Sequence, residues 1–265
     1  MILQYIPIVL PSILIVFSSI AVLYIDNGTR SRYIIAVDLS ISTLLVSFLT
    51  LIIFYGLGYY GYSLFSSTLY LSNFGYFIAV SAILATIIVI YGGMESLEPI
   101  KTRSSFLSLA MLTDLGVIYL GFAYNVITIL ASWGIASAAT YVIAMIRKDY
   151  SSTIAGVKYL IMGLLSSSLM VLGFAFFILG IGSLSLDATI NYQTLVILGI
   201  MLLSIAFLFK VGAFPFQAWL PDVYSMSDRI SVAFVSSVGK IVGIAPLFDI
   251  IYFLKPSLSL IHISE

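Results

Sequence analysis

Cysteine is absent from this chain of 265 residues, and charged residues make up only 8% of it. The absence of cysteine excludes a disulfide framework, a thiolate metal site and a cysteine nucleophile. The chain has a single histidine, His262, near its end. A pair of histidines that could ligate a haem iron is therefore absent from the sequence. Soluble domains carry about 25% charged residues. With 62% apolar residues and zero net charge, the composition indicates an integral membrane protein and argues against a nucleic-acid partner.

The apolar residues gather in segments long enough to cross a bilayer, whose ~30 Å core needs about 20 helical residues. They predict an all-α, polytopic transmembrane bundle of about eight helices, and no linker marks a soluble domain. We read the first as a retained helix, because no basic residue precedes it and no cleavage site follows it. The predicted spans are residues 3–24, 33–57, 73–92, 106–122, 124–146, 154–181, 194–220 and 230–254.

Basic residues are confined to alternate connections. Connections after the odd spans carry them, and those after the second, fourth and sixth spans carry none. The positive-inside rule therefore predicts a cytoplasmic side for the odd-to-even connections and an external N-terminus. Lys255 alone falls on the outer side. The basic residues of the odd-to-even connections are Arg30, Arg32, Lys101, Arg103, Arg147, Lys148 and Arg229.

Lys210 lies within an apolar stretch, residues 195–220, that is otherwise free of charge. Pro215 follows it closely. Proline lacks a backbone donor and its ring clashes with the carbonyl four residues back, so the helix should break near Val211, inside the membrane. An ionisable group beside a broken helix is typical of ion pathways.

Three charged residues fall at one expected level. Counted from their cytoplasmic helix ends at 1.5 Å per residue, Asp114, Lys210 and Lys240 lie at a depth of about 12–15 Å. Isolated charges at that depth are costly unless they face each other or water, so they predict a lateral hydrophilic axis. Burial favours the uncharged form of both residue types, which suits proton transfer near neutral pH. Purely structural roles, as hydrogen-bonding or packing groups, remain the alternative for all three.

Lys158 needs less explanation on this evidence alone. It lies only four residues inside its predicted helix, where its stem can snorkel to the headgroups. Asp38 and Asp249 are also near helix ends, so interface positions explain them.

The segment FKVGAFPFQAWLPDVY, residues 209–224, resembles the signature of the antiporter-like subunits of respiratory complex I. In that family FK, a PFH-type triplet and WLPD recur around a broken seventh helix. The DVY ending and the later SSVGK are more similar to the subunit N type than to the other two. Residues 155–176 resemble the sixth helix of the same type, and the family also resembles subunits of sodium/proton antiporters.

The resemblance implies a non-redox, proton-translocating membrane-arm subunit of an NADH- or ferredoxin-type quinone oxidoreductase. Lys210 matches the central proton carrier, Lys240 the eighth-helix lysine that continues the path, and Lys158 the sixth-helix lysine. We expect no metal or cofactor in this chain, and expect quinone and iron–sulfur clusters in partner subunits. The expected partners are other membrane-arm subunits and the lipid bilayer, and the expected location is a prokaryotic cell membrane, with the mitochondrial inner membrane as the alternative.

Two features depart from the family pattern. A fifth-helix glutamate, within a pattern like WELMSLPLY, is replaced by Gly134 in WGIASAATY. Family members also have about fourteen helices built from two inverted repeats of five, and this chain matches the first. We divide it into a three-helix region, residues 1–105, a five-helix repeat, 106–254, and a tail, 255–265. Another polypeptide could supply the second repeat, or the chain is a fragment or a reduced paralogue.

A compensation hypothesis follows for the missing glutamate. Asp114 lies ten residues before Tyr124 and Gly134 ten residues after it, which places both at one depth on adjacent helices. We hypothesise that Asp114 replaces the glutamate as the partner of Lys210, and that Gly134 leaves the space for its carboxylate. Two alternative functions stay open: a subunit of a sodium/proton antiporter, and a structural membrane-arm subunit that has lost pumping.

Overall fold

The computed structural model describes residues 2–26, 28–186 and 189–261. It has eight helices long and apolar enough to cross a membrane, which confirms the predicted spans. One short hairpin, β1 (Ser63–Leu64) with β2 (Leu69–Tyr70), joins the second and third. The helices are α1 (Ile6–Ile25, preceded by a 3-10 turn, Ile2–Tyr5), α2 (Arg30–Gly56), α3 (Asn73–Leu97), α4 (Arg103–Gly121), α5 (Val126–Ala144), α6 (Tyr150–Ile181), α7 (Gln193–Val211), α8 (Leu220–Met226) and α9 (Arg229–Ile261).

Short polar side chains start several of these helices. Thr29, Ser72, Asn125 and Asp149 each accept a hydrogen bond from a backbone N–H of the first turn. Such caps satisfy donors that have no partner within the helix. These local signals explain why the observed helices begin within a few residues of the predicted spans.

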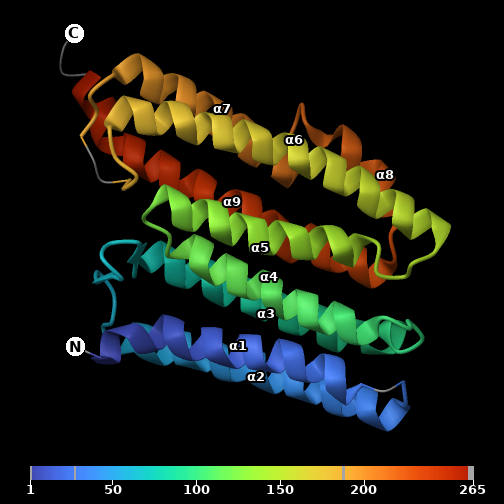
Figure 1. Cartoon of the computed structure of the whole chain (residues 1–265). Helices are drawn as coiled ribbons and strands as arrows, with labels where there is room; N and C mark the ends of the chain where they lie inside the picture. The colour runs from blue at the N-terminus through green and yellow to red at the C-terminus, as the bar shows by residue number, and fades with distance from the viewer. Residues whose placement is uncertain (1, 27, 187–188, 262–265) are drawn as a thin grey trace.

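The helices form an elongated bundle of successive pairs, as Figure 1 shows. The α1/α2 pair packs against α3/α4, then come α5 and α9, and α6 and α7 lie on the far side with α8 alongside. The segment after the break in the seventh predicted span therefore lies against α6 rather than continuing α7. Helix α9 continues beyond its predicted end to Ile261, and residues 262–265 of the predicted tail, with His262, lie outside the described residues.

Glycines allow neighbouring helices to approach closely. A Cβ on Gly116 of α4 would lie 2.8 Å from that of Ala136 on α5, and one on Gly173 of α6 would lie 3.0 Å from the carbonyl oxygen of Gly199 on α7. Small residues at such contacts are typical of helix association in membranes, where lipid tails are as apolar as the side chains. Helices α4 and α5, which are joined by a short connection, are therefore closely packed.

A buried ion pair holds two connections together at the end of the bundle that carries the basic connections, which we call the positively charged end. Arg103 donates from Nε to Asp26 Oδ2 (2.8 Å) and from Nη2 to Asp26 Oδ1 (3.0 Å), and both side chains are less than 10% exposed. Arg103 also donates to the Glu98 carbonyl and lies 4.6 Å from the ring centre of Tyr33. The hydrogen bonds from Arg103 hold the pKa of the Asp26 carboxyl below its ordinary value. The loop between α1 and α2 is therefore tied to the start of α4.

Candidate functional site

The seventh predicted span is broken where the sequence placed the break. Helix α7 ends at Val211, and Gly212 adopts the left-handed conformation, with φ of 72°. A Cβ on Gly212 would also overlap the side chain of Leu220. Glycine is therefore required here both by the backbone conformation and by the close return of the chain. Pro215 follows in the connection that leads to α8.

Protein groups satisfy the carbonyls that the break leaves free. The carbonyl oxygen of Phe209 accepts from the backbone N–H of Gly212 and from Nε1 of Trp219, each at 3.1 Å. That of Leu208 accepts from the N–H of Ala213 at 3.0 Å. A non-helical backbone is tolerated at membrane depth only when its polar groups are paired in this way. Lys210 donates to none of these carbonyls, because other groups already pair with them. The structure therefore does not support a purely structural role for Lys210 as a cap of the broken helix.

Lys210 occupies the last turn of α7 and is only 3% exposed. Its Nζ donates to Thr140 Oγ1 of α5 at 3.4 Å. It lies over the rings of Tyr141, Tyr159 and Trp133, at 4.4, 4.8 and 5.8 Å from their centres. Among the residues that the structure describes, no carboxylate oxygen lies within 4.0 Å of this nitrogen. We call Tyr141, Tyr159 and Trp133 the aromatic cage.

Contacts between helices hold each ring of the aromatic cage. Tyr141 meets Tyr159 edge to face at 4.8 Å, and Tyr159 stacks on Trp219 at 4.8 Å with an interplanar angle of 12°. Trp133 Nε1 donates to Ser167 Oγ of α6 at 3.0 Å. The cage therefore combines rings of α5 and α6 around one amine, and Trp219, in the segment after the helix break, supports the ring of Tyr159.

Glycines make room for this arrangement. A Cβ on Gly163 of α6 would overlap the hydroxyl oxygen of Tyr141, so the ring is seated against a bare helix backbone. A Cβ on Gly243 of α9 would lie 3.3 Å from the Cβ of Lys210. Any larger residue at either position has to displace a neighbour.

Asp114 makes no ion pair with Lys210 in the structure, so the direct pairing proposed in the compensation hypothesis is not observed. It is fully buried, and its Oδ1 accepts from Thr86 Oγ1 of α3 at 2.8 Å. Its Oδ2 has no hydrogen-bond partner among the described residues. The residue counts fixed its level along α4 but not its rotation about the helix axis, and the carboxylate is hydrogen-bonded to α3 instead of pairing with Lys210.

Gly134 does not face Asp114, although the compensation hypothesis requires this. Helix α5 presents Ser132 and Ala136 to Gly116 of α4. Both are two residues from Gly134, about 200° around the helix. Gly134 is exposed and a Cβ there would meet nothing within 4 Å, so it faces away from α4 and makes no space for Asp114.

Lys158 has an ionic partner that the sequence analysis missed. Its Nζ lies 2.6 Å from Asp222 Oδ2 on α8, and the two side chains are 42% and 56% exposed. Asp222 stands within the WLPD motif, so the motif was the available signal. The pair ties α8, beyond the helix break, to α6.

Lys240 is half-buried on α9, one turn before Gly243, which packs against Lys210. Within the described part of the chain, no acidic group pairs with its Nζ. The structure therefore brings Lys240 to within about one helical turn of the level of Lys210. Lys158 instead pairs with Asp222, and Asp114 accepts a hydrogen bond from Thr86.

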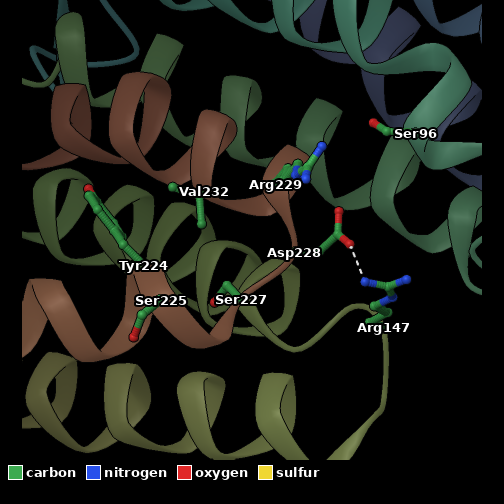
Figure 2. A pocket seen from close by; sticks show the side chains of 8 residues that line it. All are labelled: Ser96, Arg147, Tyr224, Ser225, Ser227, Asp228, Arg229 and Val232. Carbon is green, nitrogen blue, oxygen red and sulfur yellow. Dashed lines mark ion pairs between the residues drawn. The ribbon is translucent and has the colours of Figure 1, made fainter.

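A pocket of about 700 Å³ opens at the positively charged end of the bundle, and Figure 2 shows its lining. Arg147 Nη1 pairs with Asp228 Oδ2 at 3.0 Å, which links the α5–α6 connection to the start of α9. Arg229 and three serines also line it, and Tyr224 connects it to α8. The hydroxyls of Tyr224 and Ser227 are buried with no hydrogen-bond partner among the described residues.

Comparison with known families decides the affiliation of the chain. A family model described as NADH:quinone oxidoreductase/Mrp antiporter, transmembrane, matches residues 123–263, which is more than half of the sequence. The chain belongs to this family. The match covers α5 to α9, and so includes the aromatic cage, Lys210 and the helix break.

Curated relatives agree with this affiliation. The chain is 32% identical over 173 residues to NADH-quinone oxidoreductase subunit N 2 of Hydrogenobaculum, covering 64% of this chain and 37% of the relative. It is 27% identical over 256 residues to NADH-quinone oxidoreductase subunit N of Bartonella bacilliformis, covering 92% of this chain and 51% of the relative. The chain thus spans about half, or less, of the curated relatives it matches. The predicted resemblance to the subunit N type is confirmed.

Solved structures share the fold. A chain of respiratory complex I from Thermus thermophilus superposes with a TM-score of 0.75 at 20% identity, covering 89% of this chain and 52% of that one. A chain of the Mrp complex from Dietzia gives a TM-score of 0.80 at 16% identity, covering 94% and 49%. With its eight apolar helices, this antiporter-like chain is an integral, multi-pass membrane protein.

Proposed function

We propose that this chain conducts protons within the membrane arm of a complex I-related quinone oxidoreductase, and that Lys210 is the group that takes up and releases them. The observation that carries the proposal is that Lys210 is only 3% exposed and lies at a helix break, with no carboxylate oxygen within 4.0 Å of its Nζ among the described residues. Such a costly group in a membrane helix favours a functional role over a structural one.

The environment of Lys210 suits reversible protonation. Burial disfavours the ammonium form, and the ring faces and Thr140 favour it. Because no carboxylate in the described part of the chain pairs with Nζ, a modest change nearby is enough to shift the balance. A conformational or redox event in a partner subunit can therefore drive uptake and release.

Lys240 is the proposed next carrier, since it lies on the helix that packs against Lys210. Electron transfer, with its quinone and iron–sulfur clusters, is assigned to partner subunits. We place the chain in a prokaryotic cell membrane with its N-terminus outside. A second chain that supplies the second repeat stays a prediction, as do the pathway roles of Asp114 and Lys158 and the three-part division of the chain.

The test uses inverted membrane vesicles from cells that carry Lys210→Gln in the native assembly. Respiration-driven proton uptake is followed by quenching of a pH-sensitive dye, with electron flux measured in parallel. The proposal expects reduced uptake in Lys210→Gln at retained electron flux. Uptake that is unchanged at equal flux would support a structural subunit that has lost pumping, and uptake that requires added sodium would support a sodium/proton antiporter.

A further inference from the structure

The number of N–H donors on a protonated Lys210 equals the number of acceptors close to its Nζ. An ammonium has three N–H donors, and Nζ faces three acceptors at short range: Thr140 Oγ1 and the ring faces of Tyr141 and Tyr159. A neutral amine would have two donors and a lone pair, and the lone pair would meet the negative face of a ring. The geometry therefore fits the charged form better than the neutral one.

The hydroxyl hydrogen of Thr140 already takes part in another hydrogen bond. Thr140 Oγ1 donates to the carbonyl oxygen of Ser137 at 2.8 Å. Thr140 Oγ1 therefore acts as an acceptor for an N–H group of Lys210. Ring faces attract cations by about 0.5–2 kcal/mol, most strongly where water is excluded. Both tyrosine rings and Trp133 are buried, so this site meets that condition.

From this geometry we propose that the aromatic cage holds the charged form of Lys210 in place of a carboxylate, with Tyr141 and Tyr159 as its positioning residues. The inference deepens the proposed function, because it names what stabilises the protonated carrier. The cage supplies attraction without a fixed negative charge. Lys210 can consequently release its proton without leaving a buried carboxylate unpaired.

The hydroxyl of Tyr141 is not part of this interaction. It sits over Gly163 of α6, and only the ring face meets Lys210. Phenylalanine at position 141 should therefore keep the cage intact. This allows a graded test in which the shape of the ring stays nearly constant while the charge of its face changes.

The experiment replaces Tyr141 with phenylalanine and with its mono-, di- and trifluorinated forms in the full chain. Each added fluorine weakens the negative face of the ring. The 15N signal of Lys210 Nζ, assigned by its loss in Lys210→Gln, is followed in a pH titration of the purified protein. We expect the midpoint of the Lys210 titration to fall stepwise along the series, by about one pH unit in total. A midpoint that is the same throughout the series would overturn the inference.

Matched controls separate charge from packing. The same series at Phe174, a buried residue of α6, should leave the midpoint unchanged. The other titratable groups on the helices packed against α7 include Tyr150, Lys158 and Tyr159 of α6 and Arg229, Lys240 and Asp249 of α9. Lys158 and Lys240 give their own 15N signals. The readout needs no transport, so a graded midpoint with unimpaired proton uptake in Lys210→Gln would keep the cage and reject the proposed function. A Lys210 titration midpoint that is the same throughout the series, together with loss of proton uptake in Lys210→Gln, would reject the cage and keep the proposed function.

Discussion

The hydroxyl of Tyr141 on α5 occupies the space that a side chain at Gly163 on α6 would fill. This contact determines how closely the two helices approach around Lys210. It also places the ring of Tyr141 where its face meets the amine. The identity of residue 163 is therefore tied to the conformation of residue 141.

Gly163→Ala is expected to destabilise the protein by about 1–3 kcal/mol, because the added methyl overlaps a buried side chain. Gly134→Ala is the matched control, since a Cβ there meets nothing within 4 Å. Alanine in a helix interior is favoured over glycine by roughly 0.5–1 kcal/mol, so the control should be neutral or more stable. Thermal unfolding of the purified protein measures both. Equal stability of the two variants would contradict the observed packing of Tyr141.

The ion pair of Lys158 and Asp222 should depend on complementary charge rather than on residue identity. Lys158→Asp and Asp222→Lys each place like charges together and should lower the unfolding temperature. The double variant restores an opposite pair and should recover most of the loss. Because both side chains are more than a third exposed, the coupling should be only about 0.2–1 kcal/mol. Additive losses in the double variant would show that the pair does not hold α8 to α6.

Asp114→Asn tests whether the carboxylate of α4 is electrostatically coupled to Lys210. Asparagine keeps an acceptor for Thr86 and removes the negative charge. Because the structure shows no ion pair between residues 114 and 210, the titration midpoint of Lys210 should move by less than about 0.5 pH unit. A shift of a full unit or more would restore the compensation hypothesis.

The pair of Asp26 and Arg103 should make stability depend on pH. The pKa of Asp26 is lowered in the folded chain, so its contribution is present above about pH 4, the ordinary aspartate value, and is lost as the pH falls through the lower folded value. Asp26→Asn leaves Arg103 buried without its partner and should cost about 3–5 kcal/mol at pH 7. Denaturant unfolding should show the variant and the wild type converging in acid. A constant difference across pH would exclude this linkage.

The spans and the helix break could be predicted from sequence because their signals are local. Hydrophobic length identifies a transmembrane helix, and Pro215 predicts a break near Val211, the residue at which α7 ends. Lys210 was conspicuous for a similar reason, since charge is rare in such segments. The relation between Asp114 and Gly134 could not be obtained this way. The depth of a residue along its helix follows from counting residues. The direction in which its side chain points depends on which faces of the helices pack together.

The aromatic cage was missed for a compositional reason. Tyrosine occurs 18 times in the chain, so an aromatic residue in an apolar helix carries little information by itself. Trp133 and Tyr141 are eight residues apart and so share a face of α5, but nothing local shows that this face meets α7. Asp222 belongs to the WLPD motif, which indicates the family resemblance, but nothing local in the sequence indicates that it pairs with Lys158.

The most direct test of the central claim is the number of protons translocated per electron by the purified native assembly in sealed liposomes, compared between the wild type and Lys210→Gln. The account predicts a lower ratio in the variant at nearly unchanged electron flux. An identical ratio in the two assemblies would contradict it.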